Sequence, residues 1–237
     1  GCGVVRLIVP KGISTAVAPY LLEQTMFTID DENNKMKFNK DEIDKALNKL
    51  KALAIGMGWG QSKEYEKILE YILQNYDLPL IIDADGLNTL SEMNMDILKN
   101  TKCRVILTPH LKEFERLSKI SLEEIKQNEI ITAKEFARNY NIILLLKGPT
   151  TIVTDGIKVY LIKRGCSGMA TAGSGDVLSG ILVGLLGYNA PDELTVAAGA
   201  YLNGTAGELA QEKYTDISMI ASDTIKCLPE AIKIIRN

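Results

Sequence analysis

A glycine-rich stretch in the last third of the chain combines residue types that bind and transfer phosphate. Residues 165–176, GCSGMATAGSGD, hold four glycines and three hydroxyl residues ahead of one acid, and an apolar run follows from Val177. The first N–H groups of a helix lack helical partners and lie at the positive end of its dipole, so they attract anions. Asp176 falls at or next to the predicted N-cap, a position that acids favour. The stretch predicts either a phosphate cradle with a catalytic carboxylate or a capped glycine turn.

Polar residues also follow short apolar runs that we expect to form buried strands. They are Asp83, Asp85 and Asn88 after residues 78–82, His110 after 104–107, and Lys147 after 142–146. Two acids in such a place either hold Mg²⁺ or cap the next helix. A lysine there either binds phosphate as a point charge or is solvated. The only histidine of the chain is either a site residue or an ordinary surface residue.

Glycines recur at alternate positions in Gly56-Met57-Gly58-Trp59-Gly60, which follows another apolar run at 52–55. Glycine lets a ligand approach the backbone closely. The third glycine comes one position too early for the dinucleotide fingerprint GxGxxG. A binding loop and a plain strand-to-helix turn both remain open for this segment.

The elements that must position these residues alternate between strand and helix. We expect strands at 4–9, 52–55, 78–82, 104–107 and 142–146, and helices at 14–24, 41–50, 62–76, 122–139, 177–188, 191–212 and 222–235. This order predicts one α/β domain over 1–237, with a mainly parallel sheet covered by helices on both faces. The Asp155-Gly156 turn between 150–154 and 158–162 predicts a late antiparallel hairpin.

Two further segments carry specific expectations. Residues 30–44 are dense in charge and asparagine, which favours a solvated loop over a partner-binding one. Gly180, Gly184 and Gly187 recur at about one helical turn in the helix after Asp176. Because glycine weakens a helix, this spacing predicts that a neighbouring element packs tightly on that face.

The candidate residues converge on one edge of the predicted sheet. Open α/β sheets bind ligands at the carboxyl ends of their strands, where the glycine-rich stretch, Asp83, Asp85, His110 and Lys147 all fall. Asp176 would be ionised at neutral pH, since free aspartate has a pKa of about 3.9. It could accept a proton from a substrate hydroxyl that attacks phosphorus, while loop N–H groups hold the growing charge. Phosphoryl chemistry implies Mg²⁺, but the sequence does not mark its ligands.

Composition excludes several classes of protein. A net charge of −3 gives no electrostatic attraction to nucleic acid or to an anionic membrane, and one histidine excludes a His-rich metal centre. The four cysteines include no CxxC pair, which suits a reducing cytoplasm. We recognise no signal peptide and no membrane-spanning stretch in the sequence. GxxxxGK[ST] and GxSxG are absent, which excludes a P-loop protein and a nucleophile elbow.

Several motifs in order resemble a known enzyme family. Residues 171–180, TAGSGDVLSG, resemble the anion hole and catalytic aspartate of the ribokinase-like superfamily. IDADGLN at 82–88, LTPHLKEF at 107–114, LKGPTT at 146–151 and GMAT at 168–171 are similar to the ADP/ATP-dependent NAD(P)H-hydrate dehydratases. The resemblance runs from about Ala52 to Ile234 and includes the closing ASD at 221–223 with Leu228-Pro229.

This resemblance implies a repair enzyme with a ribokinase-like fold. Such an enzyme phosphorylates the hydroxyl of (6S)-hydrated NADH or NADPH with ADP or ATP, and loss of phosphate restores the cofactor. We favour ADP as the co-substrate, with Mg²⁺. The resemblance makes Asp176 the catalytic base and a hydrate contact, and it assigns hydrate binding to Gly58, Gly60 and His110. It assigns nucleotide binding to Lys147, Gly148, Pro149, Thr150, Thr151, Gly173, Ser174 and Gly175, with Asp83, Asp85 and Asn88 as supporting residues.

The resemblance also implies a homotetramer, and an epimerase of the same hydrates as a fused or separate partner. The family has an upstream strand and a hydrate-binding loop that this sequence lacks at its N-terminus, so we expect the pocket of this fragment to be shortened. Two alternatives remain open. One is a small-molecule kinase of the same superfamily, acting on a thiazole or pyrimidine alcohol or a sugar, and the other is a nucleotide-binding regulatory module without turnover.

Overall fold

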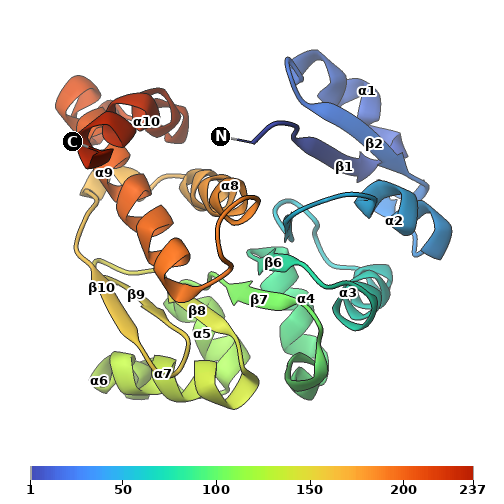
Figure 1. Ribbon diagram of the computed structural model, residues 1–237, viewed down its shortest axis with the longest axis horizontal. Helices are drawn as coiled ribbons and strands as arrows, with labels where there is room; N and C mark the ends of the chain where they lie inside the picture. The colour runs from blue at the N-terminus through green and yellow to red at the C-terminus, as the bar shows by residue number, and fades with distance from the viewer. Residues whose placement is uncertain (1, 237) are drawn as a thin grey trace.

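A six-stranded sheet forms the centre of the computed structural model, which describes residues 2–236 (Figure 1). In spatial order the strands are β10 (Val159–Ile162), β9 (Thr151–Thr154), β8 (Ile143–Leu146), β7 (Arg104–Leu107), β6 (Pro79–Ile82) and β5 (Leu53–Ile55). The four strands from β5 to β8 are parallel, whereas β9 and β10 form the expected antiparallel hairpin. Asp155 closes the hairpin turn by accepting hydrogen bonds from the N–H groups of Ile157 and Lys158.

Helices cover both faces of this sheet, as the alternation of elements predicted. On one face lie α3 (Lys63–Asn75), α4 (Asp85–Glu92), α5 (Leu111–Ser118), α6 (Leu122–Gln127), α7 (Glu129–Tyr140) and the 3₁₀ helix η3 (Met95–Asn100). On the other lie α8 (Ser174–Leu186) and α9 (Glu193–Ser218), with α10 (Ala221–Arg236) and η4 (Ser167–Met169) packed against α9 (Figure 1).

Alternate side chains of each strand enter opposite halves of the core. Ile81, Ile106 and Ile143 contact α8 and α9, whereas their neighbours Leu80 and Leu107 belong to the cluster beneath the other helices. The period of two in a strand produces this division. All four residues of β8 are buried, as expected for a continuous aliphatic run in a parallel sheet. The sheet is therefore a rigid base whose carboxyl edge holds the candidate residues.

The N-terminal quarter departs most from expectation. Here β1 (Arg6–Pro10) pairs in parallel with β2 (Thr25–Ile29), and no ladder among residues 2–236 joins this pair to the larger sheet. The helix expected at 14–24 is only α1 (Ser14–Val17), flanked by the 3₁₀ helices η1 (Lys11–Ile13) and η2 (Ala18–Tyr20). Pro19 lacks the N–H that a continuing helix needs.

The expected loop at 30–44 is also partly ordered. It holds a short hairpin of β3 (Asp31–Glu32) and β4 (Lys35–Met36). The helix expected at 41–50 follows as α2 (Lys40–Leu47). Asn33 and Asn34 between the strands both have positive φ, at 53° and 60°, which is the geometry of a tight type I′ hairpin turn. The helix expected at 122–139 is broken at Asn128, whose φ and ψ are −143° and 47°.

The expectation of tight packing along the glycines of α8 is wrong. A Cβ added at Gly180 would meet nothing within 4 Å, and those at Gly184 and Gly187 would make only ordinary contacts. The close approach occurs instead on α9, where Gly204 packs against the backbone of Arg164 and Gly207 against the side chain of Met169. Because these two glycines have no side chain, the start of the glycine-rich stretch packs closely on α9.

No helix within residues 2–236 has both the length and the apolar character needed to cross a membrane.

Alanine at Gly204 and at Gly180 should change stability in opposite directions. A Cβ at Gly204 would lie 2.6 Å from the carbonyl carbon of Arg164, which is backbone, so Gly204→Ala should lower the free energy of unfolding by about 1–3 kcal/mol. Gly180→Ala fills open space and removes the helix penalty of glycine, so it should raise that free energy by up to about 1 kcal/mol. Urea unfolding followed by circular dichroism measures both, and equal effects would contradict the packing described.

Candidate active site

The glycine-rich stretch ends in a left-handed glycine that begins α8. Gly173 is the N-cap with φ 87°, and the helix starts at Ser174, three residues earlier than expected. Its first helical hydrogen bond runs from the N–H of Val177 to the carbonyl of Gly173, at 3.0 Å. The N–H groups of Gly175 and Asp176 therefore lie in the open first turn, where anions bind. Asp176 is the third helical residue and not the cap, which corrects the sequence prediction.

Lys147 faces this helix start from the end of β8. Its Nζ lies 2.9 Å from Oδ1 of Asp83 and 3.9 Å from Oε2 of Glu113. A Cβ added at Gly175 would lie 3.6 Å from the same Nζ. This is an ordinary van der Waals distance, so the ammonium group lies directly beside the backbone of the first turn. The arrangement brings a cation and helical N–H groups to one point, as an anion site requires.

Asp83 and Asp85 have separate partners despite their proximity in sequence. Asp83 also accepts a hydrogen bond from the hydroxyl of Ser179 on α8, at 2.8 Å. Asp85 accepts one from the N–H of Gly60, at 2.7 Å, and one from Nδ2 of Asn88, at 3.3 Å. Asp85 and Asn88 therefore hold the 56–60 loop against the start of α4, while Asp83 belongs to the lysine cluster.

Asp176 remains accessible at the lip of this site. Its side chain reaches solvent, yet partial burial raises its pKa above the ordinary value for aspartate. The negative charge of Asp83 raises this pKa further, and the positive charge of Lys147 opposes the rise. A carboxylate with a raised pKa is a better proton acceptor than a free one, which suits a general base.

His110 lies beside the cluster and caps α5. Its Nδ1 accepts hydrogen bonds from the N–H groups of Lys112 and Glu113, at 3.1 and 3.2 Å, and Glu113 accepts one from the N–H of His110, at 2.8 Å. The cap requires a neutral ring with its proton on Nε2. Partial burial is the main cause that lowers the pKa of His110. Lys147 and Arg116 lower it further, and Glu113 opposes them.

The remaining predicted residues flank this centre on two loops. Gly148 and Pro149 are exposed and Thr150 is half-buried, in the turn directly after Lys147, and Thr151 begins β9. Gly58 and Gly60 have positive φ, at 71° and 68°, and the Trp59 ring between them stacks on Tyr65, with centroids 4.6 Å apart. Asp85 at the start of α4 connects this loop to the cluster, so all five predicted segments lie at the carboxyl edge of the sheet.

The sequence analysis did not identify two residues of the cluster, Glu113 and Ser179. Glu113 looked like a helix-dipole acid, yet it is buried and lies between His110 and Lys147. Ser179 is a fully buried hydroxyl in an otherwise apolar helix. A polar residue inside the run 177–186 is the one signal that could have pointed to it.

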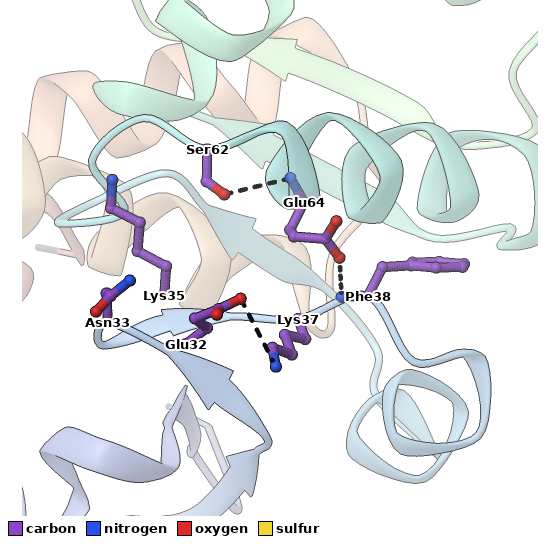
Figure 2. Close-up of a pocket in the computed structure, with 7 residues that line it drawn as sticks. All are labelled: Glu32, Asn33, Lys35, Lys37, Phe38, Ser62 and Glu64. Atoms are coloured by element: carbon purple, nitrogen blue, oxygen red, sulfur yellow. Dashed lines mark hydrogen bonds and ion pairs between the residues drawn. The ribbon is translucent and has the colours of Figure 1, made fainter.

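A separate depression of about 370 Å³ lies between the β3–β4 hairpin and the start of α3 (Figure 2). Its charged groups already have partners: Glu64 accepts from the N–H of Phe38 at 2.8 Å, and Lys37 lies 3.7 Å from Glu32. None of the predicted site residues lines it. We therefore do not assign it to the candidate site.

The fold is α/β with a mostly parallel sheet, like the solved ribokinase-like structures that it matches, and the candidate site places a lysine beside a helix start. The model of the NAD(P)H-hydrate dehydratase family matches residues 1–230, and the chain belongs to this family. It is 33% identical over 98% of its length to the bifunctional NAD(P)H-hydrate repair enzyme Nnr of Moorella thermoacetica, and covers 44% of that protein.

Two further relatives are of similar length to this chain. The ADP-dependent (S)-NAD(P)H-hydrate dehydratase of Cenarchaeum symbiosum is 32% identical over 98% of this chain and 79% of its own. The crystal structure of ADP/ATP-dependent NAD(P)H-hydrate dehydratase from Bacillus subtilis, co-crystallised with ATP/Mg²⁺, matches with a TM-score of 0.80. It is 25% identical over 98% of this chain and 82% of its own. By contrast, the chain spans less than half the length of the bifunctional relatives.

The single histidine allows a direct test of the charges around Lys147. Proton NMR should give a His110 pKa below the usual 6.5. Because the unfolded chain then binds the proton more readily than the folded chain, the free energy of unfolding should decrease as the pH falls below about 6.5. Glu113→Gln keeps a capping acceptor but removes the charge that raises this pKa, so the pKa should fall further. Lys147→Met should raise it. Shifts of the same sign in both variants would contradict the arrangement.

Proposed function

We propose that this chain dehydrates (6S)-hydrated NADH and NADPH with ADP or ATP as phosphoryl donor, and so restores the reduced cofactor. The observation that carries the proposal is the meeting of Lys147 and the first turn of α8 beside an accessible Asp176, in a member of this family. The donor transfers its terminal phosphoryl group to the hydrate hydroxyl, leaving AMP or ADP. The C–O bond then breaks and phosphate leaves as the ring double bond forms with loss of a proton.

Asp176 is the proposed base for the first step. It takes the proton of the hydroxyl as the oxygen attacks phosphorus, and its raised pKa brings it closer to neutral pH, where proton transfer is most efficient. The N–H groups of Gly175 and Asp176 and the ammonium of Lys147 hold the charge that spreads over the transferred group. The first turn of α8 thus supplies both the base and the electrostatic stabilisation.

The flanking loops are the proposed binding surfaces. Gly148, Pro149, Thr150 and Thr151 would hold the nucleotide next to Lys147, with Gly173 and Ser174 at its phosphates. Gly58, Gly60 and His110 would hold the hydrate. Nδ1 is occupied by the cap and Nε2 lies 3.5 Å from Oε2 of Glu113, so the hydrate would contact the exposed part of the His110 ring.

Mg²⁺ fits this site as a companion of the phosphates. Among residues 2–236 no group of three or more His, Cys, Asp or Glu side chains is placed to hold a metal ion. Mg²⁺ commonly binds through one or two carboxylates together with substrate phosphates. Asp83 already bonds to Lys147 and Ser179, so the phosphates and water would supply most of the ligands of the ion. The ion would supply neutralisation of phosphate charge.

Partners and assembly are part of the proposal. The bifunctional relatives are about twice as long as this chain, and we infer that it works with an activity that interconverts the epimers of the hydrate. The four cysteines are all free thiols, which supports a reducing compartment such as the cytoplasm. We also propose a homotetramer, supported by exposed Ile225, Ile232 and Ile235 on one stripe of α10.

Asp176→Asn should abolish dehydration while the fold persists. Incubating the hydrate with ADP and, in parallel, with ATP should raise the absorbance of reduced nicotinamide in the wild type. The variant should lose about 10²-fold or more of the rate, as removal of a general base does. Asp96→Asn, which changes another first-turn acid beyond the site, is the matched control and should keep full activity. An Asp176→Asn protein of wild-type rate would exclude the assigned role.

Light scattering after gel filtration tests the assembly. The wild type should elute at the mass of four chains, and Ile232→Glu should reduce the mass because it places a charge in the apolar stripe. A monomeric wild type at assay concentration would rule out the tetramer.

A further inference from the structure

We propose that Asp83 is a positioning residue whose buried carboxylate fixes the ammonium of Lys147 at the start of α8 and controls the charge felt by Asp176. This inference deepens the proposed function and rests on it, since Lys147 there binds nucleotide phosphate and Asp176 accepts the proton. The role differs from helix capping and from metal ligation, the two roles that the sequence suggested.

The burial of Asp83 and its full set of partners support a dedicated role. Its side chain is 2% exposed, and a buried carboxylate is costly unless it is paired. Oδ1 accepts from Nζ of Lys147 and from the N–H of Ala84, both at 2.9 Å, and Oδ2 accepts from the hydroxyl of Ser179 at 2.8 Å. One carboxylate therefore joins β6, β8 and α8.

The backbone around Asp83 is strained in a way that aims this carboxylate. Ala84 has φ 49° and ψ −120°, a strained conformation that non-glycine residues rarely adopt. The N–H of Asp83 donates to the carbonyl of Ile55 at 3.1 Å, and its carbonyl accepts from the N–H of Gly86 at 2.9 Å. These bonds hold the peptide on both sides while the side chain turns toward Lys147 and α8.

Ser179 connects the carboxylate to the helix that carries the base. It follows Asp176 by three positions, so both side chains lie on the same face of α8. Its hydroxyl donates to Asp83, and a Cβ at Gly175 would lie 3.7 Å from the same carboxylate oxygen. Asp83 is therefore adjacent to the turn in which Asp176 sits.

The positions of Asp83 and Lys147 also affect the pKa of Asp176. Asp83 and Lys147 are the charged groups that act on Asp176, with opposite effects on its pKa. Asp223 and Lys226 of α10, the helix that packs on Gly173, pair with each other at 2.9 Å. Glu113 and His110 lie behind Lys147. Replacing Asp83 by a neutral residue removes one negative charge and leaves the lysine less neutralised, and both changes should lower the pKa of Asp176.

Asp83→Asn, with Ser179→Ala as matched control, tests the proposal on the full chain. Ser179→Ala removes one hydrogen bond to the same carboxylate but leaves its charge. The pKa of Asp176, followed by carboxyl ¹³C NMR and assigned with Asp176→Asn, should fall in Asp83→Asn and stay near the wild-type value in Ser179→Ala. Calorimetry should show ADP binding weakened about tenfold or more in Asp83→Asn, since a misplaced binding group costs up to about 10²-fold. An unchanged pKa and unchanged ADP affinity in Asp83→Asn would overturn the proposal.

Lys147→Met tests the same ion pair by removing its cation. It should raise the pKa of Asp176, and adding Asp83→Asn to it should weaken ADP binding no further, because the charge that Asp83 positions is gone. The double variant removes both members of the Lys147–Asp83 pair and so leaves neither of them without its partner, so it should fold if Asp83→Asn alone does not. A further loss of ADP affinity in the double variant would contradict positioning.

These readouts separate this inference from the proposed function. The NMR titration needs neither hydrate nor turnover. If the wild type binds ADP without consuming hydrate, the proposed dehydratase activity fails while the pKa and affinity shifts still decide the role of Asp83. If the wild type is active and the shifts are absent, the role of Asp83 fails alone.

Discussion

The ion pair between Lys147 and Asp83 is the interaction on which the site depends. The two residues are 64 positions apart in sequence and follow strands that are not neighbours, since β7 lies between β8 and β6. Parallel strands bring their carboxyl ends to one edge, and the side chain of Lys147 crosses that edge. Among residues 2–236, Lys147 is the one cation that acts on the pKa of Asp176, and it lies beside three acids (Asp83, Glu113 and Asp176), so these side chains carry more negative than positive charge.

This balance of charge explains why no single element could form the site alone. A helix start alone attracts an anion weakly, and a lysine alone is mobile. The carboxylate of Asp83 orders the lysine, and the hydroxyl of Ser179 ties the carboxylate to the helix. The same carboxylate raises the pKa of Asp176, the proposed base. In the proposed reaction, phosphate binding and proton acceptance are therefore coupled through one buried group.

Much of the architecture could be predicted because its signals are local. The aliphatic run at 142–146, the turn at Asp155-Gly156 and the cap at Ser62 each determine an element without help from the rest of the chain. The second strand, β2, was not predicted, although its five residues, TMFTI, include the β-branched and aromatic side chains that favour a strand. Contacts such as Ser179 with Asp83, 96 positions apart, were also beyond prediction. They depend on which side chains two packed elements turn toward each other, and periodicity carries no such information.

The packing of Gly204 and Gly207 against Arg164 and Met169 also sets how the site moves. The glycine-rich stretch is anchored at its beginning by α9, where the N–H of Gly165 donates to Glu208 at 2.8 Å, and at its end by the start of α8. Only the few residues between Met169 and Gly173 are left without such anchors. Any movement of the glycine-rich stretch is therefore confined to these residues, and loops of this length move in the nanosecond to microsecond range.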